Sequence, residues 1–290
     1  MRPFSHADAT KLHEAMSGLP SAGPDLLVAL DLDGTTIRHD TSLSPRVAEA
    51  VHAHLQAGTH IVIATGRGID ATMIVAEQLV LPNGMAVCAN GAITLSREVG
   101  VVEPGIFPGA RLIDYTTFNP AGEIETIMTY VPEALLAVEP ARGPRRLSAP
   151  FPRGELVGNS VILPPDQLAG DDATRLTVRA PTLSAEELQD RIDGLGLDGV
   201  EYAVGWTAWL DISPFGVSKA TALEKLRQEY GMPTSNVLAV GDGDNDIEML
   251  GWAGTGISMG EADDRVHAAA DARTASVTDD GLAIVLERLL

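Results

Sequence analysis

Two aspartates stand one residue apart at the end of an apolar run. Residues 26–30 are all apolar, and Asp31, Leu32, Asp33, Gly34 and two threonines follow them. A short apolar run that ends in turn residues predicts a buried strand. Because side chains alternate along a strand, Asp31 and Asp33 lie on the same side of it. Buried carboxylates need a cation or hydrogen-bond donors near them. The pair therefore points to chemistry with a metal ion and a phosphate.

More carboxylates follow a second apolar run, in the segment GDGDNDIEML that starts at residue 241. Asp242 and Asp246 offer hard oxygen ligands, which Mg²⁺ takes together with water and a substrate phosphate. A calcium-binding EF-hand loop that began at Asp242 would need glycine at its sixth position and glutamate at its twelfth. Those positions hold Ile247 and Ala253, so the EF-hand is excluded and a magnesium site is predicted.

Lys219 is unusual because the chain has only three lysines among its 20 basic residues. It follows Ser218 at the start of a predicted helix, where the helix dipole disfavours a cation. A compact ammonium group at a helix N-terminus is suited to binding phosphate. Taken alone, Lys219 is better explained as a solvated surface lysine.

The elements that must position these groups alternate between strands and helices. Apolar runs predict strands near residues 26–30, 60–66, 85–91 and 236–244. Amphipathic segments predict helices near residues 5–16, 44–57, 69–80, 218–230, 245–252, 261–269 and 279–289. This alternation favours a parallel sheet with right-handed crossovers. Asp31, Thr65, Asn90 and Asp242 each stand where a predicted strand ends in a glycine-containing loop, and ligands bind at that edge of an open parallel sheet.

The pattern changes over residues 93–209, which are rich in proline. Shorter strands are expected near 174–180 and 200–211, and the capping box at Ser184 predicts a helix near 184–194. We therefore predict an α/β protein with two parts. Residues 1–92 and 210–290 form a discontinuous core with a Rossmann-like parallel sheet, and residues 93–209 form a separate inserted α+β domain.

The motifs together resemble the haloacid dehalogenase (HAD) superfamily. Its four motifs are matched in order by DLDGT from Asp31, by Thr65 in ATGR, by Lys219, and by GDGDND around Asp242 and Asp246. The insertion between the second and third motifs resembles the α+β cap of the Cof-type, or type IIB, members. The chain departs from that pattern at Ala220, where many members have glycine, and at Glu261, where asparagine is usual.

This resemblance implies roles for the matching residues. Asp31 would attack phosphorus and form an aspartyl-phosphate, and Asp33 would act as the general acid and base. The implied magnesium ligands are Asp31, Asp242, the backbone carbonyl of Asp33, and Asp246 either directly or through water. Thr65, Gly66 and Lys219 would bind the phosphate. As substrate-contacting residues we expect Asn90, Asn245, Arg67, Arg145 and Arg146.

Composition restricts the partners. The formal charge of −20 repels nucleic acid and anionic membranes, so neither is expected to bind. The N-terminus lacks the apolar segment of a signal peptide, and no apolar stretch is long enough to span a membrane. The single cysteine, Cys88, lies in an apolar run and is expected to be buried. We expect a cytoplasmic protein.

We therefore predict a Mg²⁺-dependent phosphatase that hydrolyses a small phosphorylated metabolite, with a sugar phosphate as the leading candidate. A phosphomutase of the same fold stays open, because the motifs do not separate the two reactions. A non-catalytic phosphoacceptor, such as a receiver domain, is a further alternative. A receiver domain has no general acid two residues after the phosphorylated aspartate, so Asp33 favours the enzyme.

Two features of the insertion remain open. Residues 140–153 hold four arginines and no acid, which fits either a solvated loop or an anion clamp that includes Arg145 and Arg146. Trp206 and Trp209 are expected in the core or at a domain interface rather than as a ligand platform.

Overall fold

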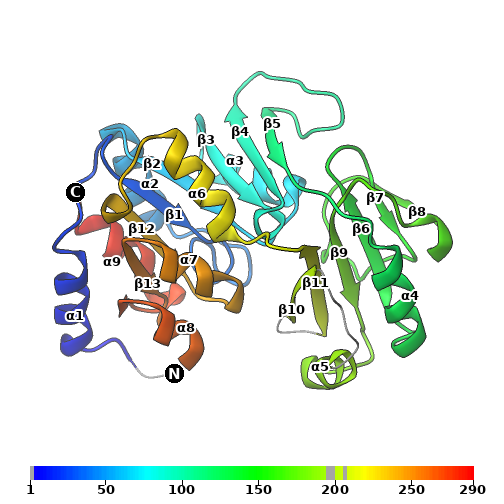
Figure 1. Ribbon diagram of the computed structural model, residues 1–290. Coiled ribbons are helices and arrows are strands. Elements are labelled where there is room, and N and C mark those ends of the chain that lie inside the picture. Colours follow the sequence, from blue (N-terminus) through cyan, green and yellow to red (C-terminus); the bar gives the residue numbers. More distant parts are fainter. Residues whose placement is uncertain (1–2, 194–199, 205–207) are drawn as a thin grey trace.

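The computed structural model describes residues 3–193, 200–204 and 208–290. It contains an eight-stranded sheet and a six-stranded sheet, which lie side by side in Figure 1. We call the eight-stranded sheet and its helices the core, and the six-stranded sheet and its helices the cap. The chain crosses between them twice, after β5 and after β11. This arrangement confirms the predicted fold class, an α/β core with an inserted α+β part.

The core sheet has the strand order β14-β13-β12-β1-β2-β3-β4-β5. All neighbouring strands from β14 to β3 are parallel, whereas β4 and β5 each run antiparallel to the strand before them. The strands are β1 (Leu27–Leu30), β2 (His60–Ala64), β3 (Asn83–Cys88), β4 (Ile93–Glu98), β5 (Ala110–Tyr115), β12 (Val237–Gly241), β13 (Thr255–Ser258) and β14 (Ala272–Arg273).

Helices cover both faces of this sheet because successive residues of its strands point to opposite sides. In β1, Val28 and Leu30 pack with α1, α2, α3 and α9, whereas Leu27 and Ala29 pack with α6, α7 and α8. The helices are α1 (His6–Met16), α2 (Pro45–Ala57), α3 (Ile69–Gln78), α6 (Lys219–Glu229), α7 (Ile247–Trp252), α8 (Asp264–Ala269) and α9 (Gly281–Glu287). Cys88 is buried, as predicted.

The cap sheet has the order β10-β11-β9-β6-β7-β8 and is antiparallel except between β7 and β8. Its strands are β6 (Leu135–Pro140), β7 (Arg145–Leu147), β8 (Ser160–Ile162), β9 (Ala173–Arg179), β10 (Val200–Val204) and β11 (Trp209–Pro214). The helices α4 (Ala121–Tyr130) and α5 (Ala185–Ile192) pack against one face of the sheet through a separate apolar cluster. The predicted capping box is present, since Ser184 and Glu187 bond each other's backbone N–H.

Strand pairing changes the predicted boundary between the two parts. Residues 93–115 were assigned to the insertion, but β4 and β5 extend the core sheet beyond β3. At the other end, β11 continues to Pro214 and pairs with β9 and β10, so residues 210–214 belong to the cap sheet. The single strand predicted near 200–211 is instead two strands, β10 and β11. Local sequence does not reveal which sheet a strand joins, because that depends on partners far along the chain.

Short 3₁₀ turns complete the structure at Ala89–Gly91, Pro165–Gln167, Thr234–Asn236, Asp244–Asp246 and Val277–Asp279. Among the helices of the described residues, none combines the length and the apolar character that a membrane span requires. Trp206, which was expected in the core or at an interface, lies outside the described residues.

Candidate active site

The four predicted strand ends meet at one edge of the core sheet. Asp31 follows β1, Thr65 follows β2, Asn90 follows β3 and Asp242 follows β12, and these strands are parallel neighbours. Asp31, Thr65 and Asp242 are all buried. The structure therefore brings these strand ends together, as the sequence predicts.

Lys219 is the cation of this site. Its side chain is fully buried, and Nζ lies 2.7 Å from Oδ1 of Asp31 and 2.7 Å from Oδ1 of Asp246. Burial lowers the pKa of Lys219, but the ion pairs with Asp246 and Asp31 outweigh this effect and hold the pKa above its ordinary value. Ser218 caps α6 and so fixes where the lysine emerges. The solvated-lysine alternative is thus excluded.

Three carboxylates crowd beside this lysine. Asp31, Asp242 and Asp246 each place an oxygen within 4.8 Å of the others. Burial and the neighbouring carboxylates Asp31 and Asp246 raise the pKa of Asp242 to about 9. Burial, followed by the charge of Asp246, raises the pKa of Asp31 to about 7 against the attraction of Lys219. A buried set of hard oxygen donors with more negative than positive charge fits a divalent cation.

Backbone and hydroxyl donors orient two of these carboxylates. Thr35 Oγ1 donates to Oδ1 of Asp242 over 3.0 Å, and the N–H groups of Asp242 and Gly243 donate to Oδ2 of Asp246. Gly34 has φ +78°, and a Cβ there would lie 2.3 Å from Asp242 Oδ2, so only glycine permits this approach. The sequence analysis gave Thr35 no role of its own, although it lies in the first motif. Its position just after the predicted strand end could have indicated that it contacts the site.

Arg67 lines the larger cavity, where it is paired with Asp33. Its Nε and Nη2 donate to the two carboxylate oxygens of Asp33 over 2.7 and 2.6 Å. A two-pronged pair of this kind fixes the orientation of a carboxylate as well as its position. Asp33 itself is about half exposed, with a side-chain exposure of 48%, and lines the cavity above Asp31.

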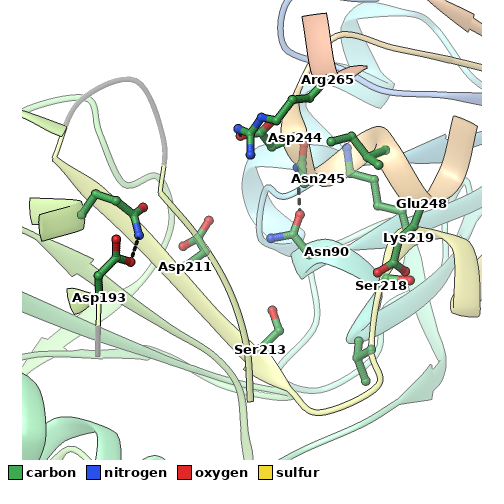
Figure 2. Close-up of a pocket in the computed structure, with 13 residues that line it drawn as sticks. Asn90, Asp193, Asp211, Ser213, Ser218, Lys219, Asp244, Asn245, Glu248 and Arg265 are labelled. Carbon is green, nitrogen blue, oxygen red and sulfur yellow. Dashed lines mark hydrogen bonds and ion pairs between the residues drawn. The ribbon is translucent and has the colours of Figure 1, made fainter. Parts of the chain in front are cut away.

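The predicted substrate residues Asn90 and Asn245 bond to each other. Asn245 Nδ2 donates to Asn90 Oδ1 over 2.9 Å, as Figure 2 shows. Asn90 lies in a left-handed turn, with φ 54° and ψ 27°. A Cβ at Gly66 would come within 2.9 Å of Asn90 Oδ1, so this glycine lets the loop after β2 pass beneath the amide bridge. The bridge thus joins the loop after β3 to the loop after β12, and the Gly66 loop packs against it.

The arginines of the cap do not form the predicted pair. Arg145 lies on the core-facing side of β7 and donates to Glu139 Oε1 and to the carbonyl of Val157. Arg146, the next residue, points to the opposite side and pairs with Asp172 over 2.7 Å. Because neighbouring strand residues face opposite sides, the two cannot clamp one anion. The hypothesis of a joint clamp is wrong.

A buried ion cluster links the cap to the core instead. Glu139 accepts from Arg145 and, over 2.9 Å, from Arg175, which also pairs with Asp211 at 3.3 Å. Arg175 Nη1 further donates to the carbonyl of Gly66 in the loop after β2. Sequence analysis missed Glu139, Arg175 and Asp211. Polar residues at every second position of β9, namely Arg175, Thr177 and Arg179, could have predicted that one face of this strand is polar.

Two adjoining cavities lie between core and cap. The larger, of about 750 Å³, is lined by the predicted catalytic residues below and by cap residues above. The smaller, of about 570 Å³, lies beyond the Asn90–Asn245 bridge and is drawn in Figure 2 with Lys219 on one side and Asp193 and Asp211 of the cap on the other. The larger cavity brings Asp31, Asp33, Thr65 and Asp242 together, as a phosphate-handling site requires.

Known proteins resemble the chain over nearly its full length. Pyridoxal phosphate phosphatase YbhA of Escherichia coli is 31% identical over 274 residues, which cover 89% of this chain and 96% of that protein. The 5-amino-6-(5-phospho-D-ribitylamino)uracil phosphatase YitU of Bacillus subtilis is 26% identical over 281 residues, covering 90% and 96%. The solved HAD subclass IIB sugar phosphatase BT4131 matches the fold with a TM-score of 0.72 at 20% identity, covering 91% of this chain and all of that one.

These likenesses confirm the predicted class of enzyme, a phosphoric monoester hydrolase. The family model for haloacid dehalogenase-like hydrolases matches residues 28–103 and 159–286, which is more than half of the chain. The chain therefore belongs to the haloacid dehalogenase-like hydrolases, the family that its motifs resemble.

Proposed function

We propose that this protein is a Mg²⁺-dependent phosphatase that hydrolyses a small phosphorylated metabolite through an aspartyl-phosphate on Asp31. The observation that carries the proposal is the buried Asp31 carboxylate, held at 2.7 Å by Lys219 beneath a cavity and beside two further aspartates. An anionic nucleophile can approach an anionic phosphate only where cations offset the repulsion.

The cation would be held by the side chains of Asp31, Asp242 and Asp246, with Asp33 contributing as the resemblance implies. When bound, Mg²⁺ would neutralise charge on the transferring phosphoryl oxygens. Lys219, which is bonded to Asp31, would supply a second positive charge, and Thr65 and Gly66 line the cavity where they could meet the remaining oxygens.

The reaction has two displacements at phosphorus. An oxygen of Asp31 attacks, the bond from phosphorus to the leaving oxygen breaks, and Asp33 gives that oxygen a proton. Asp33 then takes a proton from a water molecule, whose oxygen attacks the phosphorus of the aspartyl-phosphate. The bond to Asp31 breaks, and inorganic phosphate is released with Asp31 and Asp33 restored.

The cap supplies the roof of the cavity and would select the leaving group while excluding water. Small phosphate esters fit this space, since a cavity of about 750 Å³ lies in the range of ordinary metabolite sites. A sugar phosphate is the class of substrate named for BT4131 and stays one candidate. The cytoplasmic location and the absence of nucleic-acid and membrane partners rest on the sequence alone and also stay predictions.

Removing divalent cations should abolish turnover. We expect EDTA to lower phosphate release from 4-nitrophenyl phosphate by on the order of 10²-fold or more, and Mg²⁺ to restore it. Mg²⁺ at about 100 times its Kd should also stabilise the fold by about 2.7 kcal/mol. Asp242→Asn should lose both effects, whereas the exposed control Asp166→Asn should keep them. Full activity in EDTA would contradict the metal-dependent mechanism.

Arg67 should act through Asp33 rather than on the phosphate. Arg67→Ala leaves the Asp33 carboxylate unoriented, so kcat for an alkyl phosphate should fall by about 10- to 100-fold with little change in KM. The loss should be smaller for 4-nitrophenyl phosphate, whose leaving group needs no proton. Arg67→Lys, which keeps the charge without the fork, should resemble Arg67→Ala. An equal loss for both substrates through KM would restore the original prediction of a substrate-binding Arg67.

A further inference from the structure

The face of the cap sheet that looks onto the larger cavity is defined by strand alternation. Leu210 and Ile212 of β11 point into the apolar cluster beneath α4 and α5. The intervening residues Trp209 and Asp211 point the other way, and both line the cavity. The surface that meets the leaving group is therefore built from the alternate positions of β11 and its neighbours β9 and β6.

The positive charges on this surface already have partners. Arg145 and Arg175 share Glu139, and Arg175 also pairs with Asp211. Arg179 pairs with Glu155 over 3.1 Å. The acidic residues of the core rim that line the cavity also have partners, since Asp244 pairs with Arg265 and Asp263 caps α8. Among the described residues, the roof thus has little to attract a second phosphate or another anionic group.

Trp209 is the large aromatic group in this roof. Its Nε1 donates to Asp211 Oδ1 over 3.1 Å, which fixes the plane of the indole. Phe151 meets the ring edge-on, with ring centroids 6.1 Å apart at 75°. Trp209 is only partly buried, so this held ring remains part of the cavity wall.

Apolar side chains continue the wall around the indole. Leu156 and Val157, from the segment between β7 and β8, line the same cavity, as do Ala71 and Val266 of the core. Val157 is 40% exposed although it is apolar, so a ligand at this position would cover it. The cavity thus has polar residues suited to a phosphate on its core side, and an aromatic ring among ion-paired side chains on its cap side. Such a cavity fits a ligand with one phosphate and a flat apolar face.

We propose that the leaving group of the substrate carries a planar aromatic ring, which stacks on Trp209 while its phosphate lies at Asp31. This inference rests on the proposed phosphatase function and names its substrate class. Stacking is favoured because a ring can cover the indole without needing a counter-charge, and the hydrogen bond to Asp211 keeps the indole in place. A second phosphate would instead meet arginines that already have carboxylate partners, and an open-chain polyol would leave the apolar wall uncovered.

The test compares pyridoxal 5′-phosphate with ribose 5-phosphate and fructose 1,6-bisphosphate on the Mg²⁺-loaded full chain. We expect pyridoxal 5′-phosphate to have the highest kcat/KM. Trp209→Ala should lower that value by about 10- to 100-fold, with less than about a 3-fold change for ribose 5-phosphate. Activity on ribose 5-phosphate also serves as the check that the variant is folded.

Two variants separate stacking from structural support. Trp209→Phe keeps a ring but loses the N–H, so it should retain most activity on pyridoxal 5′-phosphate if stacking is the role. If Trp209 serves only to hold Asp211, Trp209→Phe should be as impaired as Trp209→Ala, and the proposal fails. Trp252→Phe is the matched control, because Trp252 lies in the core and bonds Glu224 away from the cavity.

Binding can be measured without turnover in Asp31→Asn. Pyridoxal 5′-phosphate should quench the tryptophan fluorescence of this variant. Most of the quenching should disappear in the double variant that combines Asp31→Asn and Trp209→Phe. Equal losses for both monophosphates in Trp209→Ala, or a preference of the unmodified protein for ribose 5-phosphate, would overturn the aromatic assignment alone. If the protein hydrolysed neither the three esters nor 4-nitrophenyl phosphate, the phosphatase function itself would be overturned.

Discussion

Asp31→Asn should lower kcat by on the order of 10⁴-fold or more while leaving the protein folded. The amide cannot attack phosphorus, so the aspartyl-phosphate cannot form. The variant also removes one of the three crowded carboxylates, where burial and like charges already raise the pKa of Asp31 to about 7. Its thermal midpoint should therefore equal or exceed that of the unmodified protein. Steady-state phosphate release and a thermal melt measure the two effects.

The control is Asp166→Asn, which makes the same chemical change at an exposed position of the cap. It should leave both activity and melting unchanged. If Asp31→Asn kept more than about one hundredth of the activity, another group would have to be the nucleophile. A large loss of stability in Asp31→Asn would instead show that Lys219 depends on Asp31 for its burial, since Asp246 would not suffice as its partner.

Glu139→Ala should destabilise the protein by about 3–5 kcal/mol. Glu139 is buried and is the shared partner of Arg145 and Arg175, so its removal leaves two buried guanidinium groups short of a counter-charge. Burial raises the pKa of Glu139, but Arg175 and Arg145 together hold it below its ordinary value. Urea unfolding, followed by tryptophan fluorescence, measures the loss.

The pH dependence of this effect has a definite sign. A carboxylate with a lowered pKa in the folded state stabilises the fold above its unfolded pKa, and that contribution is lost as the pH falls through the folded value. The difference between Glu139→Ala and the unmodified protein should therefore be full above about pH 4.5 and shrink below it.

The matched control for this cluster is Glu133→Ala, which breaks the exposed pair between Arg191 and Glu133. An exposed pair of this kind contributes little to stability, because solvent screens it. If Glu139→Ala were no more damaging than Glu133→Ala, the ion cluster would not hold the cap against the Gly66 loop. Measuring the activity of both variants shows whether the damage extends to the loop after β2, since Arg175 donates to the carbonyl of Gly66.

The sequence determined the parts of this protein that depend on short stretches of chain. The apolar run before Asp31, the capping residues at Ser184 and Ser218, and the rarity of lysine each act locally. They were enough to predict the strand ends, the helices of the core and α5, and the residues that gather at one edge of the sheet, whereas α4 was missed. In an open parallel sheet, strand order hardly matters for this result, because all carboxyl ends lie at the same edge.

Tertiary structure alone decided which partner each polar group has. It added residues 93–115 to the core sheet, placed Arg145 and Arg146 on opposite faces of β7, and paired Arg67 with Asp33. It also placed Trp209 in the wall of the cavity. These outcomes depend on contacts between residues far apart in the chain, for which neither local propensity nor hydrophobic period carries information. The residues that gather at the sheet edge could thus be predicted from the sequence, whereas the partners of the cap residues that line the cavity could not.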